Sequence, residues 1–435
     1  MSAVQPSVLD AGLPPAPPSR APTRSDRAWL ALLGAAVAGF FVVRGWLGAC
    51  LVVAGVVSLW QCVVHRREIA PMLRGARVRW LLVAFAAPLA AAVLVNLAHG
   101  EMVSRSMDAA ARMLLAGLVM LELARRRLDF TRVAHYAVPG AVFICAAWIF
   151  LAPEAPKHYW EGGRFATVFM DPLMLSLNAM VAAFLCLFLL EAPVREGRLL
   201  AAAKVAAIVL AVLVAVGTQS RTGWVMAPLL GAIWLVRASG KPTPLRIGVA
   251  LAVVLAGCVL AYATSIVVRD RVNQAAVEVL QYLDGTRFES SIGFRISLFR
   301  IALLLFAQRP WFGWGFEELP ELKTFAPVAS FYSPMLDFYF VTAGVHNEFL
   351  QAMMRMGLAG LVSKLLLFGV PLFLFARACR SAHADVRTNG YLGLVVVIGY
   401  LTAGMSTEVT NLIYAASFYG LLVAVFAAGT LKPRP

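Results

Sequence analysis

Apolar segments long enough to cross a bilayer recur along almost the whole chain, and they constrain the fold more than any other feature. A helix needs roughly 20 mainly apolar residues to cross the ~30 Å hydrocarbon core of a membrane. The segments that meet or approach this length are 28–43, 46–64, 80–98, 109–124, 133–152, 172–191, 201–218, 223–237, 246–267, 357–376, 389–405 and 411–429. The sequence therefore predicts an all-α polytopic membrane protein with about 12 transmembrane helices.

Composition and charge agree with a membrane protein. Hydrophobic residues make up 61% of the chain and charged residues 14%, whereas soluble domains average about half and about a quarter. The formal net charge is +15, and most of the Lys and Arg lie in loops on the side of the N-terminal tail. Cytoplasmic loops carry this excess, so we expect both termini in the cytoplasm and no nucleic acid partner.

The predicted spans divide the chain into five regions. Residues 1–27 are rich in Pro, Ser and Arg, lack the apolar core of a signal peptide, and are expected to form a disordered cytoplasmic tail. Residues 28–267 carry transmembrane helices 1–9, and residues 346–430 carry helices 10–12. Between them, residues 268–345 are expected to form a periplasmic loop region. Residues 431–435 form a second cytoplasmic tail.

The long interval contains two predicted helices and an aromatic segment. Residues 270–284 have apolar side chains at helical spacing and are expected to lie on the membrane surface. Residues 289–310 form a second helix, which Ser290 or Ser291 can cap. Its apolar run 301–307 is too short to span, so it is re-entrant or packed on the bundle. The aromatic segment 325–340 is interpreted as a lid or a lipid-facing surface.

His346 lies at the end of this interval, at a predicted membrane boundary, beside Asn347 and Glu348. Imidazole titrates near neutrality, so His346 can act as a general base that takes a proton from a sugar hydroxyl. The alternative is a surface or helix-capping histidine. Asn347 and Glu348 can orient the imidazole or a substrate, and Glu348 can equally be a carboxylate favoured at a helix N-terminus.

Three arginines are predicted at the same face of the membrane. Arg221 occupies a very short turn between two spans, Arg295 lies in the second helix of the interval, and Arg164 precedes the span 172–191. Arginine at a bilayer edge often contacts lipid phosphate only. Three of them able to converge suggest a diphosphate site built from forked, charge-assisted hydrogen bonds. Arg112 and Lys364 are weaker candidates.

The predicted site contains no metal motif. No outer loop has a DxD or paired-Asp sequence, and the six cysteines have no metal-ligand spacing. We therefore expect arginines, without a metal or a cofactor, to neutralise any diphosphate. Few charges lie within the predicted spans, which argues against an ion-coupled transporter.

Four sequence patches are similar to one known family. They are GRFATVFMDPLMLSLNAM at 163–180, TQSRTGW at 218–224, FRISLFRIAL with RPWFGWGFEEL at 294–319, and HNEFLQAMMRMGLAGL at 346–361. Together they resemble the O-antigen ligase and polymerase superfamily of bacterial inner membranes. One departure is Asp171-Pro172-Leu173, where the family usually has Asn-Pro-Asn.

The resemblance implies a fold like the C-type glycosyltransferases, with a long periplasmic loop between helices 9 and 10. It implies transfer of a glycan from an undecaprenyl-diphosphate carrier to an acceptor at the periplasmic face, without metal and with inversion. Carried over to this chain, His346 would activate the acceptor hydroxyl, and Arg221 and Arg295 would bind the diphosphate. Arg164, Asn347 and Glu348 would have supporting roles.

The family has several branches, and the sequence favours one of them. Ligases use lipid A–core as the acceptor, whereas polymerases use a second carrier-linked repeat unit. Twelve spans with one long loop between spans nine and ten favour the ligase. A transporter for a lipid-linked sugar is the alternative outside the enzymes, but it would need cations along a central cavity. The candidate residues gather at the outer face instead.

Overall fold

The computed structural model describes residues 23–151, 163–192, 196–240, 243–317 and 319–431. Within these ranges the regular secondary structure is entirely helical. The helices are α1 (Arg24–Ala38), α2 (Trp46–Val64), α3 (Arg66–Arg74), α4 (Ala76–His99), α5 (Ser104–Arg126), α6 (Thr131–Leu151), α7 (Pro172–Leu190), α8 (Arg198–Gly217), α9 (Arg221–Trp224), α10 (Met226–Ala238), α11 (Pro244–Thr264), α12 (Ile266–Leu283), α13 (Ser291–Gln308), η4 (Ala326–Val328), α14 (Pro334–Ala343), α15 (Glu348–Ala378), α16 (Ala384–Gly404) and α17 (Ile413–Thr430).

The all-helical prediction is confirmed for the described residues, and every predicted span overlaps a helix. Nine of the described helices are long and apolar enough to cross a membrane: α2, α4, α6, α7, α8, α11, α13, α15 and α17. Eight of them coincide with predicted spans. The ninth is α13, whose apolar run had indicated a helix too short to span. The other predicted spans fall short in length or hydropathy, so the count of twelve and the position of the outer loop stay predictions.

The predicted tails lie mostly outside the described residues. Residues 1–22 and 432–435 are not described, whereas α1 already begins at Arg24, within the predicted N-terminal tail. Thr23 caps this helix, because its hydroxyl accepts a hydrogen bond from the backbone of Asp26 at 3.2 Å. The first helix therefore starts several residues earlier than its apolar run.

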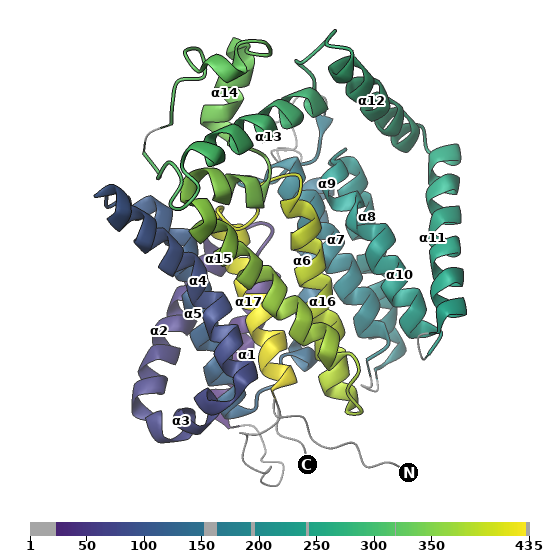
Figure 1. Ribbon diagram of the computed structural model, residues 1–435. Coiled ribbons are helices and arrows are strands. Elements are labelled where there is room, and N and C mark those ends of the chain that lie inside the picture. Colours follow the sequence, from purple (N-terminus) through teal and green to yellow (C-terminus); the bar gives the residue numbers. More distant parts are fainter. Residues whose placement is uncertain (1–22, 152–162, 193–195, 241–242, 318, 432–435) are drawn as a thin grey trace.

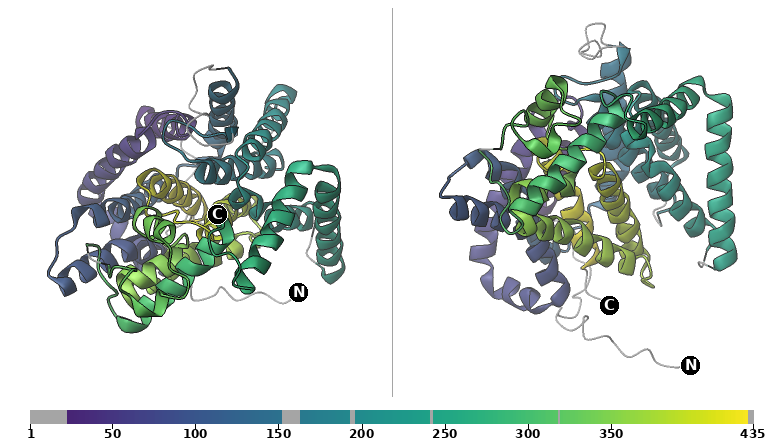
Figure 2. Two further views of the ribbon diagram at one scale, coloured as in Figure 1. Left: turned by 90° about the horizontal axis from the view of Figure 1, so that it is seen from above. Right: turned by 45° about the horizontal axis from the view of Figure 1, so that its top comes forward.

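The bundle is organised around α7 and α17. In each of these helices 83% of the most apolar 18-residue stretch is buried inside the protein, whereas in α11 the buried share is 6%. Both views of Figure 2 place α11 at the edge of the molecule. At one end of the bundle lie α12, α13 and α14, and α3 lies at the opposite end (Figure 1).

Helix α15 is bent sharply at Gly357, which has φ 61° and ψ −148°. Almost only glycine adopts this backbone conformation. The bend divides the helix into a first arm, residues 348–356, and a second arm, residues 358–378. The arms pack closely, because a Cβ on Gly360 would lie 2.4 Å from the carbonyl oxygen of Ala352.

A Gly-rich turn at residues 310–315 docks into this bend. Leu358 N donates a hydrogen bond to the carbonyl of Pro310 at 2.7 Å, and Trp314 N donates to the carbonyl of Met354 at 3.0 Å. The bend leaves backbone N–H and C=O groups of α15 without partners inside the helix, and the turn forms hydrogen bonds with them. Both arms and the turn that follows α13 therefore form one unit.

Candidate active site

A cavity of about 1050 Å³ opens at the end of the bundle that carries α13 and α14. Its walls come from α4, α5, α13, α14 and α15, together with the segment that joins α16 to α17. The Asp, Glu, His, Lys and Arg residues that line it are Arg105, Asp171, Glu289, Arg295, His346, Arg355, Lys364 and Glu408. Two of the predicted site residues, Arg295 and His346, therefore line one shared space.

The backbone that carries His346 contains two left-handed residues, Gly344 at φ 68° and His346 itself at φ 56°. Glycine is required at 344, because almost only glycine adopts its backbone angles of φ 68° and ψ −159°. Histidine tolerates the left-handed region better than most residues, with some strain. Gln351 accepts a hydrogen bond from Val345 N at 3.2 Å, which closes the turn onto α15.

The imidazole of His346 has the properties of a base that is neutral near pH 7. Burial, with the positive charge of Arg295 as the second cause, lowers the pKa of His346 to about 4. One ring nitrogen is then free to accept a proton from a hydroxyl placed in the cavity. A bound anion would offset the charge of Arg295 and raise the basicity of the ring.

Arg295 connects this cavity to further positive charges. Its Nη1 donates to the carbonyl and the hydroxyl of Ser291 at 3.3 and 3.0 Å, one turn earlier on α13. Its Nε is buried and has no hydrogen-bond partner among the described residues. The charge of Arg295 also interacts with those of Arg221 and Arg164. The guanidinium therefore has donor capacity left for an anion.

Arg164, Arg221, Arg271 and Arg295 form a group that we call the arginine cluster. Arg221, at the start of α9, donates to the backbone carbonyl of Arg271 at 3.3 Å. Arg164 donates to the carbonyl of Thr218 at 2.9 Å, just before the same short helix. Burial lowers the pKa of Arg164, and the charges of Arg271 and Arg221 add to the effect. The structure thus brings the three predicted arginines together and adds Arg271.

The acidic residues beside the cluster are Asp171 and Glu278. Both carboxylates accept hydrogen bonds from backbone N–H groups at the N-terminus of a helix. Asp171 caps α7 by accepting hydrogen bonds from Leu173 N at 2.7 Å and Met174 N at 3.0 Å. Burial raises the pKa of Asp171. Glu278 accepts a hydrogen bond from Ile292 N in the first turn of α13 at 2.9 Å. The four arginines face two carboxylates, so the region keeps an excess of positive charge.

Asn347 has a structural role in the fold. Its Oδ1 caps α15 by accepting hydrogen bonds from Phe349 N and Leu350 N, both at 3.0 Å. Its Nδ2 donates to the carbonyl of Met405 at 3.1 Å. The capping residue of α15 is therefore Asn347, and the interpretation of His346 as a helix cap is wrong.

Glu348 is fully buried and holds the segment between α16 and α17. Its Oε2 accepts hydrogen bonds from Val409 N at 2.7 Å and from Thr410 N at 3.0 Å. Its Oε1 accepts a hydrogen bond from the hydroxyl of Thr410 and lies 2.5 Å from Nζ of Lys364. These partners lie on α15 and on the segment between α16 and α17, so Glu348 positions residues 405–412 against α15.

The same segment reaches the arginine cluster. Ser406 donates a hydrogen bond to the hydroxyl of Thr222, the residue after Arg221, at 3.3 Å. Because Asn347 holds Met405 at the other side, residues 405–412 connect the turn of His346 to the helix of Arg221.

The weaker candidate Arg112 lies elsewhere. It forms an ion pair with Asp108 at 3.4 Å and donates to the carbonyl of Gly48 at 3.1 Å. It is not part of the cavity lining. Lys364 does line the cavity, where it pairs with Glu348.

Sequence reasoning missed three site residues. Arg271 belongs to the stretch that the sequence predicted as a surface helix, where an arginine is expected on the polar face. Arg355 lies inside the HNEFLQAMMRMGLAGL patch, and its position in the sequence does not distinguish it from an ordinary helix residue. Arg355 lines the cavity and donates to the carbonyls of Gly315 and Phe316. Glu408 lies in the short interval between the last two predicted spans. An acid in so short a connection between apolar segments was the available signal.

Burial raises the pKa of Glu408 to about 7. Asn411 donates a hydrogen bond to its Oε2 at 2.7 Å. Besides the neutral imidazole of His346, the cavity therefore contains a carboxyl group whose protonation can change near neutral pH. Among the described residues, no three His, Cys, Asp or Glu side chains are grouped as metal ligands.

Two comparisons with known proteins bear on this site. Residues 206–365 match the model of the O-antigen ligase family. A Haemophilus influenzae protein described as uncharacterized is 22% identical to this chain over 196 residues, which are 45% of the chain and 48% of that protein. The chain thus spans about half the length of this relative. The family match runs from α8 into α15 and includes Arg221, Arg295 and His346.

Proposed function

We propose that this protein transfers a polysaccharide from undecaprenyl diphosphate to lipid A–core, because residues 206–365 match the model of the O-antigen ligase family. The donor is the carrier-linked glycan and the acceptor is the core sugar of the lipid. The enzyme sits in the bacterial inner membrane with both termini in the cytoplasm and its site at the periplasmic face, in contact with membrane lipid. The excess of Lys and Arg on the side of the N-terminal tail supports this orientation.

One observation carries the proposal: His346 and Arg295 line the same cavity, and Arg295 interacts with the rest of the arginine cluster. A neutral base beside a group of guanidinium groups matches a reaction that removes a proton and releases a diphosphate. The cavity of about 1050 Å³ has room for sugar residues at the reacting end of both substrates.

In the proposed reaction, His346 takes the proton of an acceptor hydroxyl as its oxygen attacks the anomeric carbon. The new glycosidic bond forms while the bond from that carbon to the diphosphate oxygen breaks. The bonding electrons leave with the diphosphate, and Arg221 and Arg295 neutralise its charge, with support from Arg164. Attack opposite to the leaving group inverts the anomeric centre.

Asn347 and Glu348 support the reaction as positioning residues in this proposal. Asn347 fixes the start of α15 beside the imidazole, and Glu348 anchors residues 405–412. The reaction is proposed to be metal-independent, because the arginine cluster supplies the positive charge. Transfer by the purified protein in EDTA is the expected result, and a strict Mg²⁺ requirement would overturn this part.

The second candidate is the polymerase reaction, which uses the same donor chemistry and a second carrier-linked repeat unit as acceptor. The family match is compatible with it. A transporter of lipid-linked sugars is less favoured, because the candidate residues converge on one end of the bundle.

The test is a lipopolysaccharide gel of a deletion strain that is complemented with wild type, His346→Ala or the control His99→Ala. His99 lies at the same end of the bundle, on α4, and is not part of the cavity lining. A ligase predicts that deletion and His346→Ala leave only core lipid, with polymer accumulating on the carrier, and that His99→Ala restores the ladder. Core that carries a single repeat unit would identify a polymerase. Wild-type transfer by His346→Ala would exclude the general base.

A further inference from the structure

A second cavity, of about 960 Å³, lies at the other end of the bundle from His346. It is formed by the end of α15, the start of α16, the end of α17 and the first turns of α4. Because α15 begins beside His346 and ends at this cavity, the two cavities are separated by the long second arm of that helix. The second cavity plays no part in the proposed transfer reaction.

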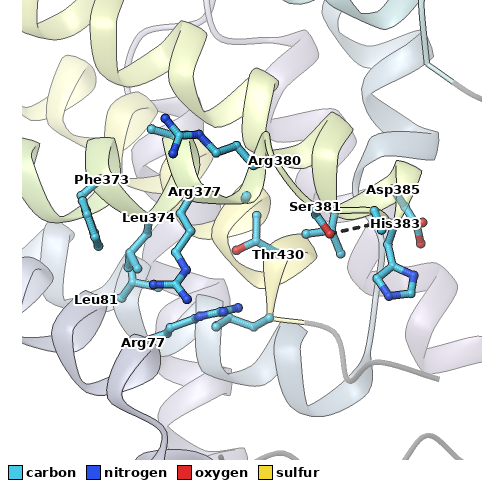
Figure 3. A pocket seen from close by; sticks show the side chains of 15 residues that line it. Arg77, Leu81, Phe373, Leu374, Arg377, Arg380, Ser381, His383, Asp385 and Thr430 are labelled. Atoms are coloured by element: carbon cyan, nitrogen blue, oxygen red, sulfur yellow. Dashed lines mark hydrogen bonds between the residues drawn. The ribbon is translucent and has the colours of Figure 1, made fainter. Parts of the chain in front are cut away.

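Three arginines line this cavity: Arg77 on α4, Arg377 in the last turn of α15, and Arg380 just after it. Figure 3 shows these side chains together with His383 and Asp385, which lie at the opposite edge of the view. Asp385 is the one acidic residue among the described lining residues. The cavity therefore carries an excess of positive charge.

Arg380 is the most available of the three cations. The residue is exposed, and its guanidinium makes no hydrogen bond or ion pair with another residue in the described part of the chain. The connection that carries it is fixed, because Arg387 donates hydrogen bonds to the carbonyls of Ser381 at 2.8 Å and Ala382 at 3.2 Å. The guanidinium of Arg380 thus extends from an ordered connection between α15 and α16, and its N–H groups are available to bind an anion.

Apolar side chains line the cavity next to these charges. Leu81 comes from α4, and Phe373 and Leu374 come from the last turns of α15. Phe373 is 61% exposed, on a helix that is long and apolar enough to span a membrane. A cavity with basic groups at the helix ends and apolar groups one turn deeper matches an amphiphile with an anionic head.

We propose that this cavity binds the phosphate headgroup of an anionic membrane lipid. Guanidinium groups of Arg377 and Arg380 contact the phosphate oxygens through forked hydrogen bonds, and Arg77 adds charge from α4. The first part of an acyl chain packs against Phe373 and Leu374. Free phosphate offers the same headgroup chemistry but lacks the chain, so the two sources can be distinguished.

The experiment measures lipid binding by the full-length protein in detergent, by native mass spectrometry and by the shift in its unfolding temperature. Phosphatidylglycerol, phosphatidylcholine and inorganic phosphate are titrated separately. The proposal predicts retention and stabilisation by phosphatidylglycerol, and little effect of phosphatidylcholine. Equal binding of both lipids would overturn it. A shift with inorganic phosphate as large as with phosphatidylglycerol would overturn the lipid assignment in favour of a soluble anion.

Variants locate the bound lipid. Arg380→Gln is expected to weaken phosphatidylglycerol binding by about fivefold, the effect of one basic residue near a membrane surface, and Arg377→Gln/Arg380→Gln by more. The matched control is Arg67→Gln, because Arg67 is an exposed arginine on α3 at the same end of the bundle and is not part of the cavity. Since the guanidinium of Arg380 has no partner among the described residues, its variant should fold normally. Unchanged binding by the double variant, or equal loss in the control, would overturn the proposal.

Discussion

Nζ of Lys364 lies 2.5 Å from Oε1 of Glu348, although both residues belong to α15. In a straight helix their Cα atoms would be about 24 Å apart, at 1.5 Å per residue. The ion pair forms because the helix folds back at Gly357, which brings the start of the first arm beside the second arm. Through this pair, the turn that carries His346 is fixed against a membrane-length helix.

The bend at Gly357 should not tolerate any side chain. A Cβ would lie 2.4 Å from the backbone carbon of Trp311, and the positive φ disfavours every other residue. We expect Gly357→Ala to lower the unfolding temperature and to abolish glycan transfer, since the arms and the docked turn must separate. Gly369→Ala is the control, because a Cβ at that position of the same helix meets nothing within 4 Å. The fold-back argument fails if the two variants behave alike in thermal unfolding and transfer assays.

Removing one partner of the buried ion pair should cost more than removing both charges. Lys364→Met leaves the carboxylate of Glu348 without its cation, and breaking such a pair typically costs about 3–5 kcal/mol. In Glu348→Gln/Lys364→Met no isolated charge remains, so part of the stability should return. Unfolding temperatures of both variants and of Glu348→Gln measure the coupling. A double variant less stable than Lys364→Met would show that charge pairing is not the dominant contribution.

The pH dependence of transfer should differ between the free and the loaded enzyme. The pKa of His346 is lowered to about 4 in the empty site, so the acid limb of kcat/KM should fall near that value. A bound diphosphate offsets Arg295 and stabilises the imidazolium, so the acid limb of kcat should lie at higher pH. Initial rates with a carrier-linked donor give both profiles. Identical limbs would argue against contact between the diphosphate charge and His346.

Glu408 should make stability fall as pH rises. Its pKa is raised from an ordinary 4.5 to about 7, so the folded protein keeps a proton that the unfolded chain releases in that window. The stabilisation is complete below about 4.5 and is lost as pH rises through about 7. His346 acts in the opposite sense at the lower pH values, because its pKa is lowered.

The difference between a variant and wild type isolates the contribution of Glu408. The stability of Glu408→Gln relative to wild type is expected to increase as pH rises from about 4.5 to about 7. Glu289→Gln provides the control, since Glu289 is an exposed carboxylate in the lining of the same cavity. Thermal unfolding across this range is the measurement, and a pH-independent difference would contradict the raised pKa.

The sequence predicted the helical class and the separate positions of His346, Arg221 and Arg295, because apolar runs and isolated polar residues are visible in one dimension. It placed the start of a span at Gly357, which is where the second arm begins. The fold-back was not predictable, since residues 348–356 have an ordinary helical pattern and the backbone angle of one glycine decides their direction. Asn347 and Glu348 were assigned near the substrate because hydrogen bonds to residues 405–412 cannot be read from spacing.

The arginine cluster is expected to lower the stability of the folded protein while its site is empty. Like charges gathered around Arg221 and Arg295 repel one another while the site is empty, and the nearby carboxylates are occupied at helix termini. An occupied site relieves this repulsion, so the loaded enzyme is the more stable form by mass action. A natural substitution that removes one of these arginines would then raise the free energy of unfolding and abolish the proposed activity. Selection for stability alone would favour such a substitution. Persistence of the cluster in a lineage would then indicate continued selection for binding of the anionic substrate that we propose.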